Sequence, residues 1–194
     1  MRRIILATAM LVVVLLGYAV WPLYGLKQLA GAAHARDVSA LSELVDYRSV
    51  RQSLSEQLIA TYLRVTGRAP GPLTNLVAVV GTSLADPLLE EFLDPAKLAD
   101  FLMTGQLPRS AGEQVSEFAP LNGAALQSGW RIWLASEYSG RVFSASLPPD
   151  KRPSEQVRLQ LRLRSWRWKL TSIELPKALR ERLVQAVVKT SPGH

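Results

Sequence analysis

The sequence predicts an α+β protein with an N-terminal transmembrane helix, several further helices, a curved antiparallel sheet of about four or five strands, and a C-terminal helix. Three observations lead to this prediction. The stretch from Ile4 to Trp21 has no charged side chain. Apolar residues then recur at spacings of three and four as far as residue 104, which is typical of helices. From residue 115 they alternate with polar residues, which is typical of strands.

The N-terminal residues 1–22 are expected to form an uncleaved signal anchor. Arg2 and Arg3 precede the apolar stretch, which is about long enough for a helix to cross a hydrocarbon core of roughly 30 Å. Tyr18, Trp21 and Tyr24 stand where an aromatic belt at the membrane interface would lie. Small residues that could mark a cleavage site occur only further downstream, between residues 30 and 35, so a cleaved signal peptide is the less favoured alternative. The basic end should stay in the cytoplasm, which places residues 23–194, a single domain, on the far side of the membrane.

The helical part of this domain, residues 23–104, shows several helix starts. An aspartate before an apolar-periodic run can accept hydrogen bonds from the free N–H groups of the first helical turn. Asp37 and Asp46 each precede such a run, and Asp86 and Asp94 each precede a proline, which suits the first helical position. The charged stretch 35–51 could be interpreted as an active site, but caps and solvated charges account for it. We therefore expect structural roles there.

The second part of the domain, residues 115–190, is expected to hold the sheet and the C-terminal helix. Ser139 and Gly140 form a plausible tight turn, and Pro176 opens the final helix. The candidate strands are residues 115–121, 130–138, 141–147, 155–164 and 166–173.

A basic hairpin is the most unusual local pattern, because aliphatic and cationic residues alternate over residues 157–170. If the two strands pair, one face carries Arg158, Arg162, Arg164, Arg167 and Lys169. This face could recognise acidic phospholipid or an anionic envelope partner. The alternative is a solvated sheet face whose arginines pair with Glu137 or Glu155. Nucleic acid is not an expected partner, because aromatic residues are not interleaved on the basic side.

The composition argues against an enzyme and against a cofactor. The chain has no cysteine, which excludes thiolate catalysis and every zinc site that uses sulfur. Its two histidines, His34 and His194, stand without a paired carboxylate motif, so we expect neither a metal site nor a Ser-His-Asp arrangement. An enzyme would need a buried acid, and Asp46 is the one weak candidate.

A pocket between the helices and the concave face of the sheet is an alternative hypothesis. Aromatic residues that could line it and hold an apolar small molecule or lipid are Tyr62, Trp130, Phe143 and Trp168. Aromatic residues at such spacings more commonly fill a core.

Three stretches carry a resemblance to a known family: "WPLYGLKQLAGAAHARDVSALSELVDYRSVRQSL", "SGRVFSASL" and "LRLRSWRWKLTSIELP". They resemble the uncharacterised bacterial family called domain of unknown function 2939 (DUF2939), over roughly residues 22–62 and 138–176, with Tyr47 where phenylalanine is expected. The resemblance implies a bacterial domain that is membrane-anchored or exported, and it implies no catalytic residue. The order of elements is also similar to the nuclear-transport-factor-2-like (NTF2-like) and cystatin-like rolls, which host enzymes and inert modules alike.

These observations predict a non-catalytic binding or accessory module of the bacterial envelope. It is expected at the inner membrane, with one N-terminal span and the C-terminal domain in the periplasm. An apolar ligand-binding protein of the roll fold is the alternative, and an enzyme of that fold is the third.

Overall fold

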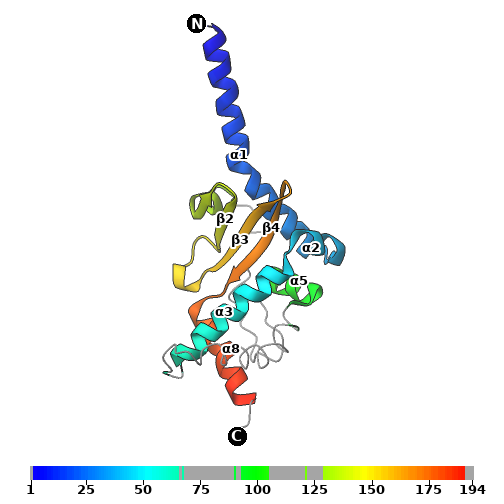
Figure 1. Cartoon of the computed structure of the whole chain (residues 1–194), viewed down its shortest axis with the longest axis vertical. Coiled ribbons are helices and arrows are strands. Elements are labelled where there is room, and N and C mark those ends of the chain that lie inside the picture. Colours follow the sequence, from blue (N-terminus) through cyan, green and yellow to red (C-terminus); the bar gives the residue numbers. More distant parts are fainter. Residues whose placement is uncertain are drawn as a thin grey trace.

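The computed structural model describes residues 2–65, 67, 90, 93–104, 121 and 129–190. Their α+β class agrees with the prediction (Figure 1). The helices before the sheet are α1 (Arg2–His34), α2 (Val38–Leu44), α3 (Tyr47–Val65), α5 (Pro95–Thr104) and α7 (Gly129–Leu134). The remaining elements are β1 (Ser136–Ser139), β2 (Val142–Leu147), the 3-10 turn η3 (Pro153–Glu155), β3 (Val157–Arg164), β4 (Arg167–Glu174) and the final helix α8 (Lys177–Thr190).

The sheet is a simple antiparallel meander in the order β1-β2-β3-β4. Strands β2 and β4 match the predicted ranges 141–147 and 166–173 to within one residue at each end. Strand β3 ends where the predicted range 155–164 ends but begins two residues later, since Glu155 belongs to η3. The predicted strand 130–138 is wrong over its first half, because residues 129–134 form α7. Over the six residues of α7, the spacing of apolar residues does not distinguish a helix from a strand. Among the side chains of α7 that the structure describes, that of Ile132 is buried. The predicted strand 115–121 lies outside the described residues except for Leu121.

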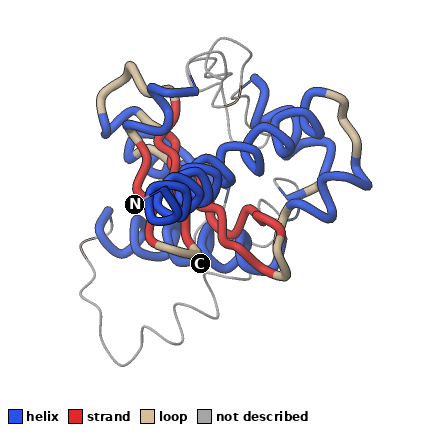
Figure 2. Tube along the Cα trace, turned by 90° about the horizontal axis from the view of Figure 1, so that it is seen from above, coloured by secondary structure: helices blue, strands red, loops and turns tan. Residues whose placement is uncertain are grey.

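Helix α1 has two parts with opposite surroundings. One side of its C-terminal part is buried in the core, where Leu26, Leu29 and Ala33 are each 1% exposed. Its N-terminal part extends away from the domain, and Figure 2 looks down it from above. The predicted transmembrane helix is not supported: over the described residues, no helix has both the length and the apolar character needed to cross a membrane.

The core lies on the aliphatic face of the sheet. Leu159 and Leu161 of β3, Leu170 of β4 and Phe143 of β2 are all at most 1% exposed. Their alternation with polar neighbours is the pattern that makes one face of a strand apolar. Helix α1 contacts β3 and β4 and also packs on α5, so the buried half of α1 belongs to the same core.

Helix α3 runs beside the free edge of β4 and satisfies part of its backbone (Figure 1). The N–H of Asp46 donates to the carbonyl of Leu170 over 2.9 Å. Further along, the Gln57 amide donates to the carbonyl of Ile173 (2.8 Å) and accepts from the N–H of Leu175 (3.0 Å). One side-chain amide therefore takes the place of a neighbouring strand and protects an edge that would otherwise be open to pairing.

Candidate functional site: a groove beside helix α1

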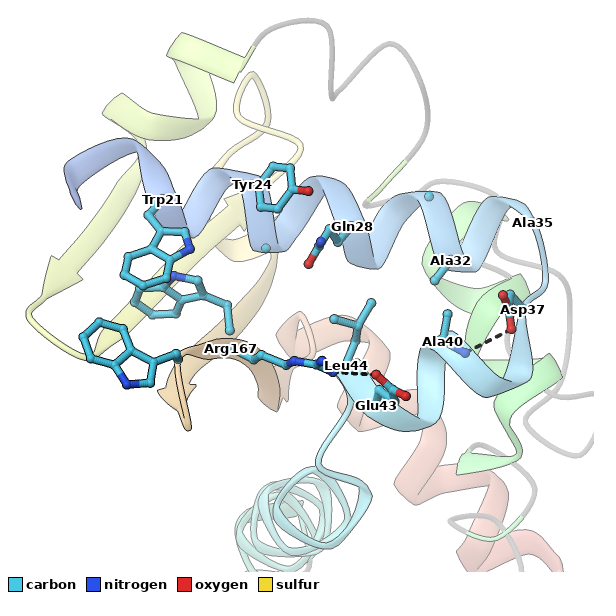
Figure 3. Close-up of a pocket in the computed structure, with 14 residues that line it drawn as sticks. Trp21, Tyr24, Gln28, Ala32, Ala35, Asp37, Ala40, Glu43, Leu44 and Arg167 are labelled. Carbon is cyan, nitrogen blue, oxygen red and sulfur yellow. Dashed lines mark hydrogen bonds and ion pairs between the residues drawn. The ribbon is translucent and has the colours of Figure 1, made fainter. Parts of the chain in front are cut away.

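A groove of about 610 Å³ lies between α1, α2 and the turn that joins β3 to β4 (Figure 3). Helix α1 supplies one side, and α2 with the residue before it supplies the other. The turn and the start of β4 close one end. The lining residues are Trp21, Tyr24, Gly25, Gln28, Gly31, Ala32 and Ala35, then Asp37, Ala40, Glu43 and Leu44, then Trp166, Arg167 and Trp168.

Small residues of α1 shape the groove. A Cβ added at Gly25 would lie 2.5 Å from the Cβ of Trp168, whereas one added at Gly31 would meet nothing within 4 Å. At Gly25 the helix therefore lies close against β4, whereas Gly31 faces open space. Ala32 and Ala35 also line the groove, and their short side chains fill little of it.

An aromatic cluster closes the groove at the point where α1 leaves the domain. The rings of Trp21 and Trp166 are stacked, with centroids 5.8 Å apart and planes inclined by 24°. Tyr18 meets Trp21 edge-on at 6.3 Å and Tyr138 at 5.8 Å. The Tyr18 hydroxyl also donates to the carbonyl of Gly140 (2.9 Å), so the β1–β2 turn is held against the same part of α1.

The two carboxylates of the groove, Asp37 and Glu43, are both engaged within the protein. Arg167 and Glu43 form an ion pair of 2.6 Å across the mouth (Figure 3). Both side chains are more than 60% exposed, so solvent screens the pair. The Asp37 carboxylate accepts from the N–H of Ala40 (3.0 Å) and caps α2. The indole Nε1 of Trp168 is buried and has no hydrogen-bond partner among the described residues.

The side chains of the groove are mainly aromatic or small. Among the described residues that line it there is no serine, cysteine or histidine. Across the described part of the chain, no group of three or more histidine and carboxylate side chains could hold a metal ion. Aromatic rings, small side chains and a few polar groups at the rim are typical of a site for an apolar ligand.

The predicted basic face is largely compensated by carboxylates. In the hairpin register Arg162 lies opposite Lys169, and Arg164 lies opposite Arg167. Ion pairs join Arg158 to Glu137 (3.4 Å), Arg164 to Asp46, and Arg167 to Glu43. Pairing with Glu137 is the arrangement that the solvated-face alternative predicted. Within the described residues, Arg162 and Lys169 form no ion pair of this kind.

Asp46 is the most constrained carboxylate near this face. It accepts from the N–H of Ser49 (3.1 Å) at the start of α3, and its side chain is only 17% exposed. Burial alone would raise its pKa, but the hydrogen bonds from Ser49 and the charges of Arg164 and Lys169 outweigh burial and lower the pKa below the usual 3.8. This acid is therefore ionised at neutral pH, which is the opposite of what a proton-donating catalytic acid needs.

The other predicted caps divide between described and undescribed residues. Asp94 accepts from the N–H groups of Ala96 (3.0 Å) and Lys97 (3.2 Å) at the start of α5. Asp86 lies outside the described residues.

The four residues predicted to line a pocket lie on four different elements, α3, α7, β2 and β4. Phe143 and Trp168 are in edge-on contact, with centroids 6.5 Å apart, but both are buried in the core. Tyr62 packs against the core from α3. Trp130 lies in α7, and its side chain is outside the described part. Of the three whose side chains are described, Trp168 lines the groove.

The sequence reasoning missed the groove because it assigned the residues of α1 to other roles. Trp21 and Tyr24 were interpreted as interfacial aromatics, and Trp166 as the first residue of a strand. One signal was available: Gly25, Gly31, Ala32 and Ala35 are small residues at intervals that place them along one side of a helix. Such a row permits close approach, or leaves a hollow where nothing approaches.

The comparisons with known proteins give one match. No curated protein and no solved structure matches the chain significantly, so the roll fold stays a prediction. The model of the family described as "Protein of unknown function (DUF2939)" matches residues 11–101. The matched range includes α2, α3 and most of α1, and the second similar stretch, residues 138–176, lies beyond it. The chain is therefore similar to this family of unknown function over its N-terminal half, which supports the resemblance seen in the sequence.

Proposed function

We propose that the protein is a non-catalytic binding module of the bacterial envelope that is attached to a membrane by the N-terminal part of α1. One observation carries the proposal: this part of the helix exposes its apolar side chains, and the described residues of the domain do not cover them. Ile4 is 72% exposed, Met10 71% and Val13 67%. The other exposed apolar residues of the same part are Ile5, Leu6, Leu11, Val12, Val14 and Val20.

The energetic argument favours lipid over water. Covering one large aliphatic side chain contributes about 1.5–3 kcal/mol, so covering all of these gains on the order of 10 kcal/mol. The hydroxyl of Thr8 lies in this part of α1 and is already satisfied, because it donates to the carbonyl of Ile4 over 2.9 Å. A helix satisfies its own backbone groups, so little in this part of α1 opposes transfer into a bilayer.

Flotation of the full chain with liposomes tests the attachment. The informative variant replaces Ile5 and Val13 by lysine, since both are exposed and outside the core. The control replaces Val38 and Val65 by lysine, which are also exposed, at 49% and 47%, but on other helices. We expect wild type and control to float and the α1 variant to stay in the dense fraction. Equal flotation of the two variants, or a wild type that does not float, would contradict the proposal.

The proposed location is the inner membrane, with the domain in the periplasm. Its support is the pair Arg2 and Arg3 ahead of the apolar part, since basic residues tend to stay in the cytoplasm. Protease added to spheroplasts should digest the domain without lysis. Protection until lysis would place the domain on the cytoplasmic side.

The groove supports a second candidate function, the binding of an apolar small molecule or a lipid chain. Its volume of about 610 Å³ falls within the range of roughly 300–1,000 Å³ that is typical of ligand pockets. Residues 21–35 form one wall, so a fragment that lacks them would lose the site, and the test needs the full chain.

Native mass spectrometry of the full chain, released from detergent, tests this second candidate. Gly31→Leu adds a side chain to the groove lining, at a position where an added Cβ meets nothing within 4 Å. Gly17→Leu adds the same group outside the groove, where an added Cβ likewise meets nothing within 4 Å. We expect a reproducible added mass on wild type and Gly17→Leu that is lost in Gly31→Leu. An added mass that persists in Gly31→Leu would remove the groove as its site.

Recognition of acidic phospholipid by the basic hairpin is a third proposal. Because Arg158, Arg164 and Arg167 form ion pairs with carboxylates, the proposal rests on Arg162 and Lys169. Arg162 and Lys169 face each other across the strands, whereas Arg158 is engaged by Glu137. Replacing Arg162 and Lys169 by glutamine should weaken binding to liposomes rich in phosphatidylglycerol more than Arg158→Gln does. Equal binding of the three proteins would exclude this role.

A further inference from the structure

We infer that the β3–β4 turn is a second membrane contact, in which the Trp166 side chain enters the lipid headgroup region beside α1. This inference rests on the proposed attachment through α1, and it adds an interaction surface on the folded domain itself.

The backbone of the turn is one that a tryptophan does not favour. Arg164 pairs with Arg167, which leaves Ser165 and Trp166 as a two-residue connection. Their φ angles are 49° and 62°, both in the left-handed region. Tight hairpins of this kind favour Asn-Gly, because a side chain in that region costs about 1–2 kcal/mol. Glycine at position 166 would remove this cost.

The contacts of Trp166 inside the domain do not explain its presence. The residue is 78% exposed, the largest exposed fraction among the large apolar residues described. Its stacking on Trp21 contributes about 0.5–1.5 kcal/mol, which at best offsets the backbone cost. Most of the ring therefore offers apolar surface to something outside the domain.

The position of the β3–β4 turn indicates that the partner of Trp166 is a lipid bilayer. Trp166 stacks on Trp21, and the β1–β2 turn accepts a hydrogen bond from Tyr18, one turn of helix closer to the N-terminus. These two α1 residues are only about 4.5 Å apart along the axis, so both hairpin turns meet α1 at nearly the same level. The exposed apolar part of α1 begins at this level (Figure 1). A bilayer that takes up that part of α1 reaches the turns at its surface.

The side chains that lie at this level of α1 are of the kinds that suit a lipid headgroup region. Tryptophan and tyrosine concentrate at membrane interfaces, where an apolar ring with a polar atom is favoured at the boundary. Arg141 is exposed and directly follows Gly140 in the β1–β2 turn, which places a cation where lipid phosphates would lie. A soluble protein partner would not account for the continuity with the apolar part of α1.

Site-specific fluorescent labelling tests the inference, and the chain is suited to it because it has no cysteine. Trp166→Cys, Ile5→Cys and Lys177→Cys are each labelled with the environment-sensitive dye NBD in the full chain. The labelled proteins are reconstituted into vesicles of phosphatidylcholine and phosphatidylglycerol that carry a nitroxide on the shallow part of the acyl chain. Lys177 is an exposed residue at the start of α8, at the opposite end of the domain from the projecting part of α1 (Figure 1).

We expect a blue shift and nitroxide quenching at positions 5 and 166, and neither at position 177. Quenching at position 5 with a label at 166 that behaves like the one at 177 would overturn the inference and leave the attachment intact. No quenching at position 5 would overturn the attachment and the inference with it.

An unlabelled variant guards against a label that disturbs the turn. Trp166→Gly should keep or raise the free energy of unfolding, because glycine suits the backbone, and should reduce the quenching of tryptophan fluorescence by brominated lipid. Undiminished quenching in Trp166→Gly would also overturn the inference.

Discussion

The contact between Gly25 and Trp168 fixes the projecting helix to the sheet, and it makes a sharp prediction for Gly25→Ala. The added Cβ would lie 2.5 Å from the Cβ of Trp168, 3.0 Å from its Cγ and 3.3 Å from its Cδ1. The first of these atoms is the base of a side chain on a buried strand, so it cannot swing aside as the end of a flexible chain could. The helix itself would have to move away from β4.

Two opposing effects set the magnitude. Alanine in place of glycine inside a helix gains about 0.5–1 kcal/mol. Overpacking of a well-packed core costs typically about 1–3 kcal/mol. Gly31→Ala has the first effect without the second, because nothing lies within 4 Å of its added Cβ. The difference in stability between the two alanine variants therefore isolates the clash, and we expect it to be about 1–3 kcal/mol.

Urea denaturation of the full chain in a mild non-ionic detergent measures this difference. With a slope of about 2 kcal/mol per molar urea, the midpoint of Gly25→Ala should fall about 0.5–1.5 M below that of Gly31→Ala. Gly31→Ala should be at least as stable as wild type. Equal midpoints for the two variants would refute the close packing of α1 on β4, and with it the argument that the projecting helix is rigidly held by the domain.

Three further predictions concern groups near β4. Asp46→Ala should lower stability by about 1 kcal/mol through loss of a helix cap, whereas Asp46→Asn should keep the cap and lose only the charge. Because the folded-state pKa of Asp46 is lowered, its carboxylate stabilises the fold above the unfolded-state pKa of about 3.8. This stability is lost as pH falls through the folded-state pKa. The difference in thermal unfolding midpoint between wild type and Asp46→Asn should therefore disappear below that pH. Gln57→Leu should cost about 1–3 kcal/mol in urea unfolding, because two buried backbone groups lose their partner, and a loss below that range would show that water replaces the amide. Replacing Ser165-Trp166 by Asn-Gly should not lower the unfolding midpoint, and a clear drop would mean that the Trp21 stack outweighs the backbone cost.

Much of the local structure could be predicted from the sequence because local rules decide it. The strand ranges of β3 and β4 follow from alternation of apolar and polar residues over eight residues in each strand. The capping contacts of Asp37 and Asp46 depend only on a carboxylate and the next turn of chain. The error at α7 arose where the run was too short for either period to dominate.

The tertiary structure decided which side chains share a site. Alternation placed five cations on one face, but it could not show that Glu43 and Asp46, more than a hundred positions away, would neutralise Arg167 and Arg164. The groove likewise depends on how closely α1 approaches β4 at Gly25, which is a matter of packing between distant segments. Sequence periodicity reports which face of an element is apolar; which distant element covers that face, and how far it stands away, is determined only when the chain closes on itself.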